Sequence, residues 1–370
     1  MKVLFHSRSN LYTAPGGDLI QMEKTKEYLQ KLGVEVDIFR PDLDVESYDI
    51  IHLFNLMNPQ DIYDMMQKAK KHNIPVVLST IYGLYTEFER KARGGVFQQL
   101  ARHISPYQIE YVKNSIRHIK ENRFHKGVQR MMYKGFYPMM KEIVDNTSVF
   151  LPNSESEMLR VAREFNLNKY KYVNVPNAVD LQLFNENVKV LPEQEKFKDS
   201  VICVARIEGR KSTLNVVKAM KDLPYNLFLI GKASHNQGKY VENVRRAAQK
   251  NVELSGTVPH ENLPGIYKAA KVHVLASWME TPGLSSLEAA AMGCNIVATR
   301  KGDTYDYFGD YAFYCEPDDV NSIRQAIEKA HRSPVNPELA QIIKEKCNWE
   351  ITAKKTLEAY QMALSDNNFL

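Results

Sequence analysis

Cysteine is scarce in this sequence of 370 residues, and its cysteines form no recognisable site. The four are scattered and lack the short spacing of a zinc site; they are Cys203, Cys294, Cys315 and Cys347. Cys203 and Cys294 lie in or beside apolar runs. We therefore expect reduced thiols in the core of a cytoplasmic protein.

Long hydrophobic runs are also missing. No apolar run approaches the roughly 20 residues that a membrane-spanning helix requires. The first ten residues, MKVLFHSRSN, lack the long apolar region of a signal peptide and are typical of a strand. These absences exclude an integral membrane protein and lead us to expect neither a signal peptide nor secretion.

What the sequence does contain is a repeated alternation of strands and helices. The chain is too long for one ordinary core, and short apolar strands alternate with helical patterns in both halves. A polar stretch without clear periodicity, at 181–198, separates the two halves. We therefore predict an α/β protein of two doubly wound, Rossmann-like domains facing across a cleft, with bounds at 1–180 and 181–350.

The most informative stretch, Trp278 to Thr299, reads WMETPGLSSLEAAAMGCNIVAT and follows an apolar strand. It predicts a tight turn and a short helix, with Glu280 in the turn and Glu288 in the helix. Eight helical residues span about 12 Å, farther than a paired catalytic acid and base require. Two carboxylates so spaced suit the two ends of one long ligand, with phosphate at the helix start between them. The alternative is that both are ordinary surface glutamates.

Two other loops carry residues suited to an anionic ligand. Arg206 and Lys211 follow the strand predicted at 200–205, where two cations can neutralise a diphosphate. The pair Gly16 and Gly17 follows the first predicted strand, where backbone can approach a phosphate or a sugar. The alternatives are a solvent-facing basic turn and an ordinary glycine-containing loop.

A basic helical segment, 87–141, interrupts the strand–helix rhythm. Residues 90–141 hold 12 Lys and Arg but only two acids, Glu110 and Glu121, a local net charge of +10. Three interpretations stay open: a solvated basic face, a surface for anionic lipid headgroups, and a nucleic-acid site. The third lacks any recognised motif, so we expect no nucleic-acid partner. The second would place the protein peripherally at the inner face of a membrane.

Together these motifs resemble a known family. Glu280-x7-Glu288, VARIEGRK (204–211), VPNAVD (175–180), the Gly16–Gly17 loop and WEITAKKTLEAY (349–360) are similar to retaining glycosyltransferases of the GT4 class. The resemblance covers most of the chain and is weakest at 85–145. It implies a GT-B fold, a nucleotide-sugar donor, no metal, and a final helix, 351–370, that crosses back to the first domain.

The resemblance also implies roles for individual residues. Arg206 and Lys211 would hold the donor diphosphate, Glu288 the ribose and Glu280 the transferred sugar. The remaining donor-binding residues would be Gly16, Gly17, Gly231, Lys232, Val258, Gly283, Leu284 and Ser285. A hexosyltransferase acting on a saccharide or lipid-linked saccharide in cell-surface polysaccharide synthesis is the function we expect.

The sequence departs from the family after the fourth predicted strand, where many relatives carry a histidine facing the reacting sugar. Here the segment is LSTIYGLY, so Tyr82 is one acceptor-site candidate. His52, at the end of the third predicted strand, is another, although a histidine of the core or the cleft wall is the favoured interpretation of it. Two rival functions remain: a nucleotide-sugar epimerase or hydrolase on the same fold, and a non-enzymatic basic protein that binds lipid or RNA.

Overall fold

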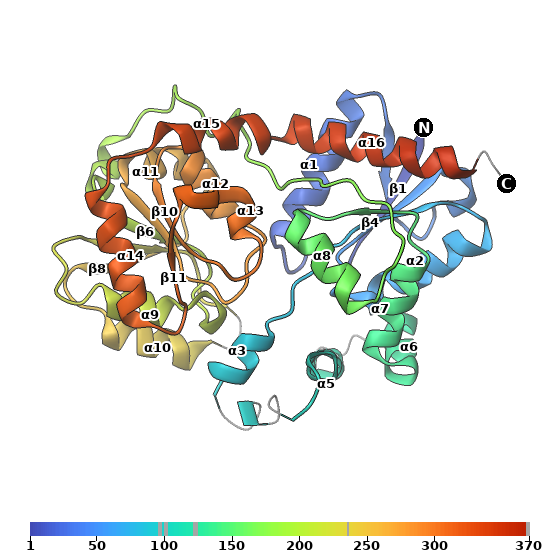
Figure 1. Cartoon of the computed structure of the whole chain (residues 1–370), viewed down its shortest axis with the longest axis horizontal. Helices are drawn as coiled ribbons and strands as arrows, with labels where there is room; N and C mark the ends of the chain where they lie inside the picture. The colour runs from blue at the N-terminus through green and yellow to red at the C-terminus, as the bar shows by residue number, and fades with distance from the viewer. Residues whose placement is uncertain (95–97, 100–102, 121–124, 235–236, 368–370) are drawn as a thin grey trace. The chain divides into compact units, whose positions relative to one another are not determined.

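The computed structural model of the chain (Figure 1) describes residues 1–94, 98–99, 103–120, 125–234 and 237–367. The chain divides into two compact units. Unit 1 consists of 1–84, 99–177 and 349–370, and unit 2 of 85–98 and 178–348. The sequence analysis placed the boundary three residues later, at 180/181, and assigned 85–98 to the first domain. Parts of the basic segment, and residues 368–370 of the predicted last helix, lie outside the described residues.

Unit 1 is built on a five-stranded parallel sheet with the order β2-β1-β3-β4-β5. Its strands are β1 (Lys2–His6), β2 (Glu35–Ile38), β3 (Ile50–Phe54), β4 (Val76–Ser79) and β5 (Val149–Leu151). Val3 pairs with Val36 on one side and with Ile50 on the other. The central strands β3 and β4 are mostly apolar and fully buried because both faces of the sheet are covered.

Helices cover each face of this sheet. On one face, α1 (Gly17–Lys31) and α16 (Trp349–Asn367) pack against each other, as Figure 1 shows. On the other lie α2 (Pro59–Lys71), α7 (Phe136–Asp145) and α8 (Glu155–Glu164). Ser154 caps α8 by accepting a hydrogen bond from the amide of Glu157, which places the start of the helix directly after β5.

Unit 2 contains a six-stranded parallel sheet with the order β11-β10-β9-β6-β7-β8. Its strands are β6 (Val201–Val204), β7 (Leu227–Ile230), β8 (Val252–Gly256), β9 (Val272–Leu275), β10 (Asn295–Thr299) and β11 (Phe313–Cys315). Its α-helices are α3 (Thr86–Lys91), α9 (Thr213–Ala219), α10 (Gly238–Ala247), α11 (Leu263–Ala269), α12 (Leu284–Ala291), α13 (Thr304–Phe308), α14 (Val320–Arg332) and α15 (Pro337–Lys346). Separate apolar cores occupy the two faces of the sheet.

Each unit is thus a doubly wound α/β domain, and the predicted fold class is confirmed. In such sheets the strand order reverses at a switch point, and ligands bind at the carboxyl ends of the two strands that flank it. The reversal lies between β1 and β3 in unit 1 and between β6 and β9 in unit 2. We therefore expect ligand-binding residues in the loops that follow these two strand pairs.

The described part of the basic segment is helical, as predicted, and it is shared between the units. Helix α3 belongs to unit 2, whereas α5 (Pro106–Lys120), α6 (Lys126–Lys134) and α7 belong to unit 1. All four cysteines are buried and free of disulfides, as expected. Among the described residues, no helix combines the length and apolarity needed to cross a bilayer.

Candidate functional site

The switch point of unit 2 holds an ion pair between two predicted site residues. Lys211 ends the 3-10 turn Gly209–Lys211 after β6, and Glu280 lies in the turn after β9. The Lys211 ammonium is bonded to a carboxylate oxygen of Glu280. Only 15% and 10% of these side chains are exposed. Burial alone would lower the pKa of Lys211, but the charge and hydrogen bond of Glu280, together with Tyr85 and Glu208, outweigh burial and raise that pKa, so the lysine stays a cation.

Backbone contacts hold Glu280 in place. Its amide donates to the carbonyl of Lys301 (3.2 Å), and the amide of Asp303 donates to the carbonyl of Glu280 (2.8 Å). Gly302, between them, has a φ of +89°, and a Cβ there would lie 2.2 Å from the carbonyl oxygen of Glu280. Only glycine therefore allows the loop after β10 to approach this closely.

Helix α12 begins beside this pair. Gly283 precedes the helix with a φ of +84°, and a Cβ there would lie 3.4 Å from a carboxylate oxygen of Glu280. Within the described part of the chain, no hydrogen bond engages the amides of Gly283, Leu284 and Ser285. Free amides at a helix start, with the helix dipole behind them, form a site that favours an anion.

Glu288 lies farther along α12 and has partners that the sequence analysis missed. One carboxylate oxygen lies 2.8 Å from His260 Nε2, and the other accepts a hydrogen bond from Tyr267 Oη at 3.2 Å. The hydrogen bond to Glu288 raises the pKa of His260. His260 stands in a polar loop and Tyr267 in a helix core, so no local pattern in the sequence connects either residue to Glu288.

Arg206 lies at the rim of the site. About half of its side chain is exposed, and its guanidinium lies 3.9 Å from Glu208, whose side chain is buried. Burial would raise the pKa of Glu208, but Arg210, Ser234 and Arg206 together lower it, so this carboxylate stays charged. The structure brings Arg206 and Lys211 into the same loop, five residues apart in sequence, with Glu208 between them.

Gly231, directly after β7, lies against the loop that follows β6. A Cβ on Gly231 would lie 2.0 Å from the carbonyl oxygen of Ala205 and 3.5 Å from the amide of Arg206. The carbonyl of Lys232 accepts a hydrogen bond from Ile207 (3.0 Å). The third residue predicted to border the base, Val258, is half-buried against the core of unit 2.

Residues 85–88, just before and at the start of the basic segment, also contribute to this site, which no local pattern in the sequence indicates. The guanidinium of Arg210 lies 4.6 Å from the ring centre of Tyr85. Glu87 pairs with Lys301 at 3.0 Å, and the Phe88 ring packs edge-on against Trp278. The segment therefore contacts the loops after β6, β9 and β10, although it precedes them by more than 100 residues in the chain.

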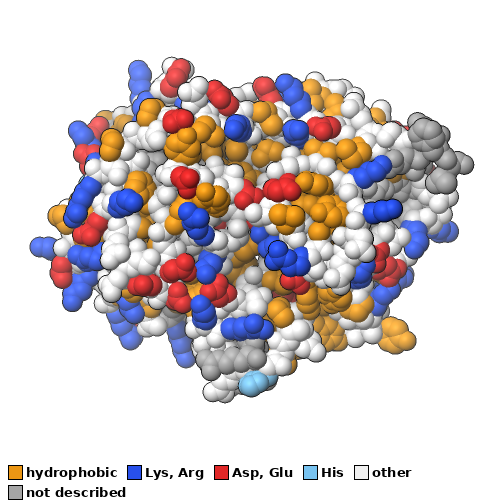
Figure 2. All heavy atoms as spheres, in the orientation of Figure 1, with side chains coloured by type: hydrophobic (Ala, Val, Ile, Leu, Met, Phe, Trp, Pro, Cys, Tyr) orange, Lys and Arg blue, Asp and Glu red, His pale blue; other side chains and the backbone are white. Residues whose placement is uncertain are grey.

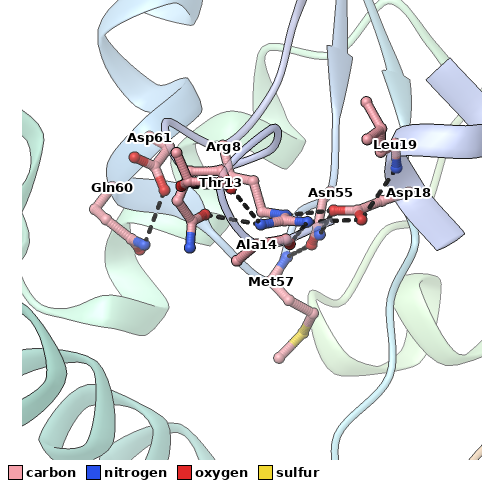
Figure 3. Close-up of polar contacts among 10 residues, drawn as sticks. Arg8, Thr13, Ala14, Asp18, Leu19, Asn55, Met57, Gln60 and Asp61 are labelled. Carbon is pink, nitrogen blue, oxygen red and sulfur yellow. Dashed lines mark hydrogen bonds and ion pairs between the residues drawn. The ribbon is translucent and has the colours of Figure 1, made fainter. Parts of the chain in front are cut away.

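The switch point of unit 1 holds a second ion pair, shown in Figure 3. Arg8, after β1, binds both carboxylate oxygens of Asp18 at 2.5 and 2.9 Å. It also donates to Asn10 and to the carbonyl of Ala14, and Asn55, after β3, donates to Asp18 at 3.1 Å. Burial would raise the pKa of Asp18, but Arg8 and Asn55 lower it. Gly16 and Gly17 lie within the loop that this cluster closes.

The two acceptor-site candidates are buried in unit 1. His52 is fully buried, with its ring nitrogens 2.7 Å from Tyr360 Oη and 2.8 Å from Ser79 Oγ. Burial lowers its pKa to about 3, so it is a neutral core residue, and the acceptor role considered for it is withdrawn. Tyr82 is 2% exposed, and its hydroxyl lies 2.7 Å from the hydroxyl of Tyr107. A ligand in unit 1 would therefore contact Tyr107 before Tyr82.

Comparisons with known proteins agree with this architecture. Residues 184–349 match the family model described as "Glycosyl transferases group 1". A D-inositol 3-phosphate glycosyltransferase of Corynebacterium urealyticum is 23% identical over 94% of this chain and 90% of its own. O-antigen chain mannosyltransferase B of Escherichia coli is 24% identical over 60% of this chain and 63% of its own.

A solved structure extends the likeness to the whole chain. HepE of Anabaena, in complex with UDP and glucose, matches with a TM-score of 0.61 at 16% sequence identity. The match covers 100% of both chains. Residues 184–349 therefore match the group 1 glycosyltransferases, the whole chain has the GT-B fold, and glycosyl transfer is the activity that this match and the relatives support.

Proposed function

We propose that this protein is a retaining, metal-independent glycosyltransferase. It takes a sugar from a nucleoside-diphosphate sugar and transfers it to a saccharide or lipid-linked saccharide in cell-surface polysaccharide synthesis. The Lys211–Glu280 pair at the switch point of unit 2 is the observation that carries the proposal. The HepE complex with UDP and glucose supports this class of donor, and the O-antigen enzyme supports this class of pathway.

The charged groups suit the parts of such a donor. Glu288, held by His260 and Tyr267, accepts hydrogen bonds from the ribose hydroxyls. Lys211, Arg206 and the amides of Gly283 to Ser285 bind the diphosphate, and Glu280 binds the sugar hydroxyls. Gly231 and Lys232 border the base, and Gly16 and Gly17 stay donor-binding candidates.

In the transfer step, the acceptor oxygen forms a bond to the anomeric carbon while the bond to the diphosphate oxygen breaks. The acceptor proton passes to the departing phosphate oxygen on the same face of the sugar, which retains the anomeric configuration. Lys211 and Arg206 stabilise the negative charge that develops on the diphosphate. Two fixed cations there replace the metal ion that other transferases use.

Separate roles for the two glutamates give the sharpest test. Glu288→Gln should mainly weaken binding of the nucleoside diphosphate, measured by calorimetry. Glu280→Gln should slow transfer much more than it weakens nucleoside diphosphate binding. Glu261→Gln, at an exposed position of unit 2, is the control and should behave as wild type. Equal losses of diphosphate affinity in both variants would refute this division.

Choosing the donor comes first in practice. A thermal-shift panel of nucleotide sugars should single out one, because a ligand at 100 times its Kd stabilises the folded state by about 2.7 kcal/mol. The same donor incubated without acceptor separates the rival enzymes. Isomerised sugar would indicate an epimerase, and steady hydrolysis unaffected by any acceptor would indicate a hydrolase.

We also propose that the acceptor is reached at an anionic membrane surface, so that the protein is cytoplasmic and peripheral. The local charge of +10 over 90–141 supports this, because each Lys or Arg near anionic lipid contributes about 1 kcal/mol. The double variant Arg117→Glu/Lys120→Glu should lose binding to anionic vesicles. Lys354→Glu/Lys355→Glu, also exposed and in unit 1, should not. Unchanged binding of the first variant would end the membrane proposal.

A further inference from the structure

Unit 1 contains a groove that the donor site does not use. It has a volume of about 590 Å³, within the range of small-molecule sites. Helix α5, the start of α7 and the end of α8 form its walls. The lining residues are Ser105, Tyr107, Gln108, Tyr111, Gly135, Phe136, Tyr137, Pro138 and Glu164.

The tyrosines of the groove offer a ligand their rings, because their hydroxyls are bonded within the protein. Tyr107 donates to Glu164 at 2.9 Å, and Tyr137 donates to the backbone carbonyl of the same residue at 2.9 Å. Tyr111 donates to the carbonyl of Met132 at 3.0 Å. Because these hydroxyls already have partners within the protein, the groove offers mainly apolar ring surface. Sugar hydroxyls would find few free polar groups there, whereas a hydrocarbon chain needs none.

The same helix carries an apolar stripe leading away from the groove. Gln108, Val112 and Ile116 are spaced by four residues and lie in one row along α5, with Ile119 beside them. Val112, Ile116 and Ile119 are 39%, 39% and 56% exposed. Helix α5 thus shows apolar residues to solvent while it buries Asn114 and His118. Figure 2 shows hydrophobic side chains gathered over the part of unit 1 that holds α6 and α7.

Positive charge flanks this stripe. Arg117 and Lys120 are exposed on α5, and Lys126 is exposed on α6, which packs against α5. Arg130 on α6 is exposed as well, but it already pairs with Asp64. An apolar groove and stripe beside cations match a ligand with a hydrocarbon chain and an anionic head. A lipid phosphate has this chemistry.

We propose that the α5–α7 groove binds the hydrocarbon chain of a lipid-phosphate acceptor. This inference rests on the proposed function, because it specifies the lipid-linked acceptor named there. It also gives the basic segment a role in substrate binding, beyond attraction to a membrane. The groove binds the first part of the chain, and the stripe on α5 extends the apolar contact.

Alkyl phosphates of increasing chain length provide the test, with the full chain and calorimetry below the micelle concentration. Affinity should rise by about fourfold for each added methylene that is buried, until the groove is filled. Inorganic phosphate, the arm without a chain, should bind at least 100-fold more weakly than dodecyl phosphate. If dodecyl phosphate binds no better than inorganic phosphate, the groove does not bind a chain.

A blocking variant locates the site. Gln108→Trp places an indole at an exposed position in the groove, and we expect it to weaken dodecyl phosphate binding by at least tenfold. Gln108→Glu adds a charge at nearly constant size and should weaken it as well. Gln129→Trp, exposed on α6 and outside the groove lining, is the matched control. Wild-type affinity in both Gln108 variants would overturn the proposal.

Two further readouts separate this proposal from the others. Binding of the nucleotide sugar should be unchanged in Gln108→Trp. If the wild-type protein binds no nucleotide sugar, the proposed function is refuted, whereas the proposal for the groove is tested only by dodecyl phosphate binding. Vesicles of anionic phospholipid form the last arm. If Gln108→Trp reduces vesicle binding but leaves dodecyl phosphate binding intact, the surface binds the bulk membrane, and the chain-binding groove is refuted.

Discussion

The two units have similar ion pairs at equivalent points of their sheets, but the cations of the two pairs differ in how many of their N–H donors lack a partner within the protein. Arg8 and Asp18 lie at the switch point of unit 1, and Lys211 and Glu280 at that of unit 2. All four side chains are at most 15% exposed. Arg8 has five N–H donors, and its hydrogen bonds to Asp18, Asn10 and Ala14 engage all of them.

Lys211 is in the opposite situation. Within the described part of the chain, its ammonium makes one hydrogen bond, to Glu280, although it has three donors. Two donors therefore remain for a ligand, and the free amides at the start of α12 lie beside the pair. The position of an ion pair in a doubly wound sheet therefore does not decide its role. The number of uncommitted donors does, and it predicts a structural pair in unit 1 and a ligand-binding pair in unit 2.

The largest effect should come from removing the ligand-binding cation. Lys211→Ala should reduce the rate of transfer about 1,000-fold, because the charge that develops on the diphosphate loses its closest preorganised cation. Steady-state kinetics with the donor from the thermal-shift panel measure this. Lys218→Ala, exposed on α9, is the control and should stay within twofold of wild type. A loss smaller than tenfold for Lys211→Ala would mean that this pair, too, is structural.

Removing the structural cation should instead destabilise the fold. Arg8→Gln leaves Asp18 buried without its partner, and we expect urea unfolding to show a loss of about 3 kcal/mol. Arg40→Gln, whose side chain is 68% exposed, should change stability by less than about 0.5 kcal/mol.

A double variant tests whether the loss of stability in Arg8→Gln comes from the unpaired carboxylate of Asp18. Arg8→Gln/Asp18→Asn removes the uncompensated carboxylate and should recover part of the lost stability. If the double variant is no more stable than Arg8→Gln, then the hydrogen bonds to Asn10 and Ala14, rather than the charge pair, hold the loop.

A smaller effect should follow from disturbing the backbone that positions Glu280. Gly302→Ala places a Cβ 2.2 Å from the carbonyl oxygen of Glu280 at a φ of +89°, so the loop after β10 must shift. We expect about a tenfold loss of transfer rate and about 2 kcal/mol of stability. Gly256→Ala is the matched control, since its φ is +73° but a Cβ there meets no heavy atom within 4 Å. It should cost about 1 kcal/mol and no activity. Equal activity losses in both would show that strain alone, rather than the position of Glu280, lowers the rate.

The fold could be predicted because its signals are local. The apolar runs at 2–6 and 76–79 predict strands, and they form β1 and β4 with the same bounds. The helix expected after Pro282 and Gly283 is α12. The run at 172–175 also predicts a strand, but the structure has only a single bridge there, between Tyr172 and Phe150. That segment lies beyond the edge strand β5, where only a short contact with the sheet remains.

From the sequence, site residues could be predicted only where a charged residue comes directly after one of the strands that flank the switch point. Lys211 and Glu280 were both assigned to the diphosphate and sugar end, and the structure pairs them. The partners of Glu288 and the place of α3 in unit 2 were missed, because those contacts join segments far apart in sequence. His52 is a core histidine, the interpretation favoured for it, but no local pattern in the sequence indicates that Tyr360 and Ser79 enclose it.

The smallest effect concerns Glu288, which faces a titratable cation, whereas Asp18 and Glu280 face cations that stay charged at neutral pH. The hydrogen bond to Glu288 raises the pKa of His260 above its ordinary value of 6.5. The pair therefore stabilises the folded state fully below pH 6.5, and its contribution is lost as the pH rises through the raised pKa of His260. Half of the His260 side chain is exposed, so solvent screening keeps this contribution small. Urea midpoints measured across this range should show His260→Gln less stable than wild type at acid pH and equal to it at alkaline pH. A stability gap that does not change with pH would mean that His260 packs against Phe184 rather than neutralising Glu288.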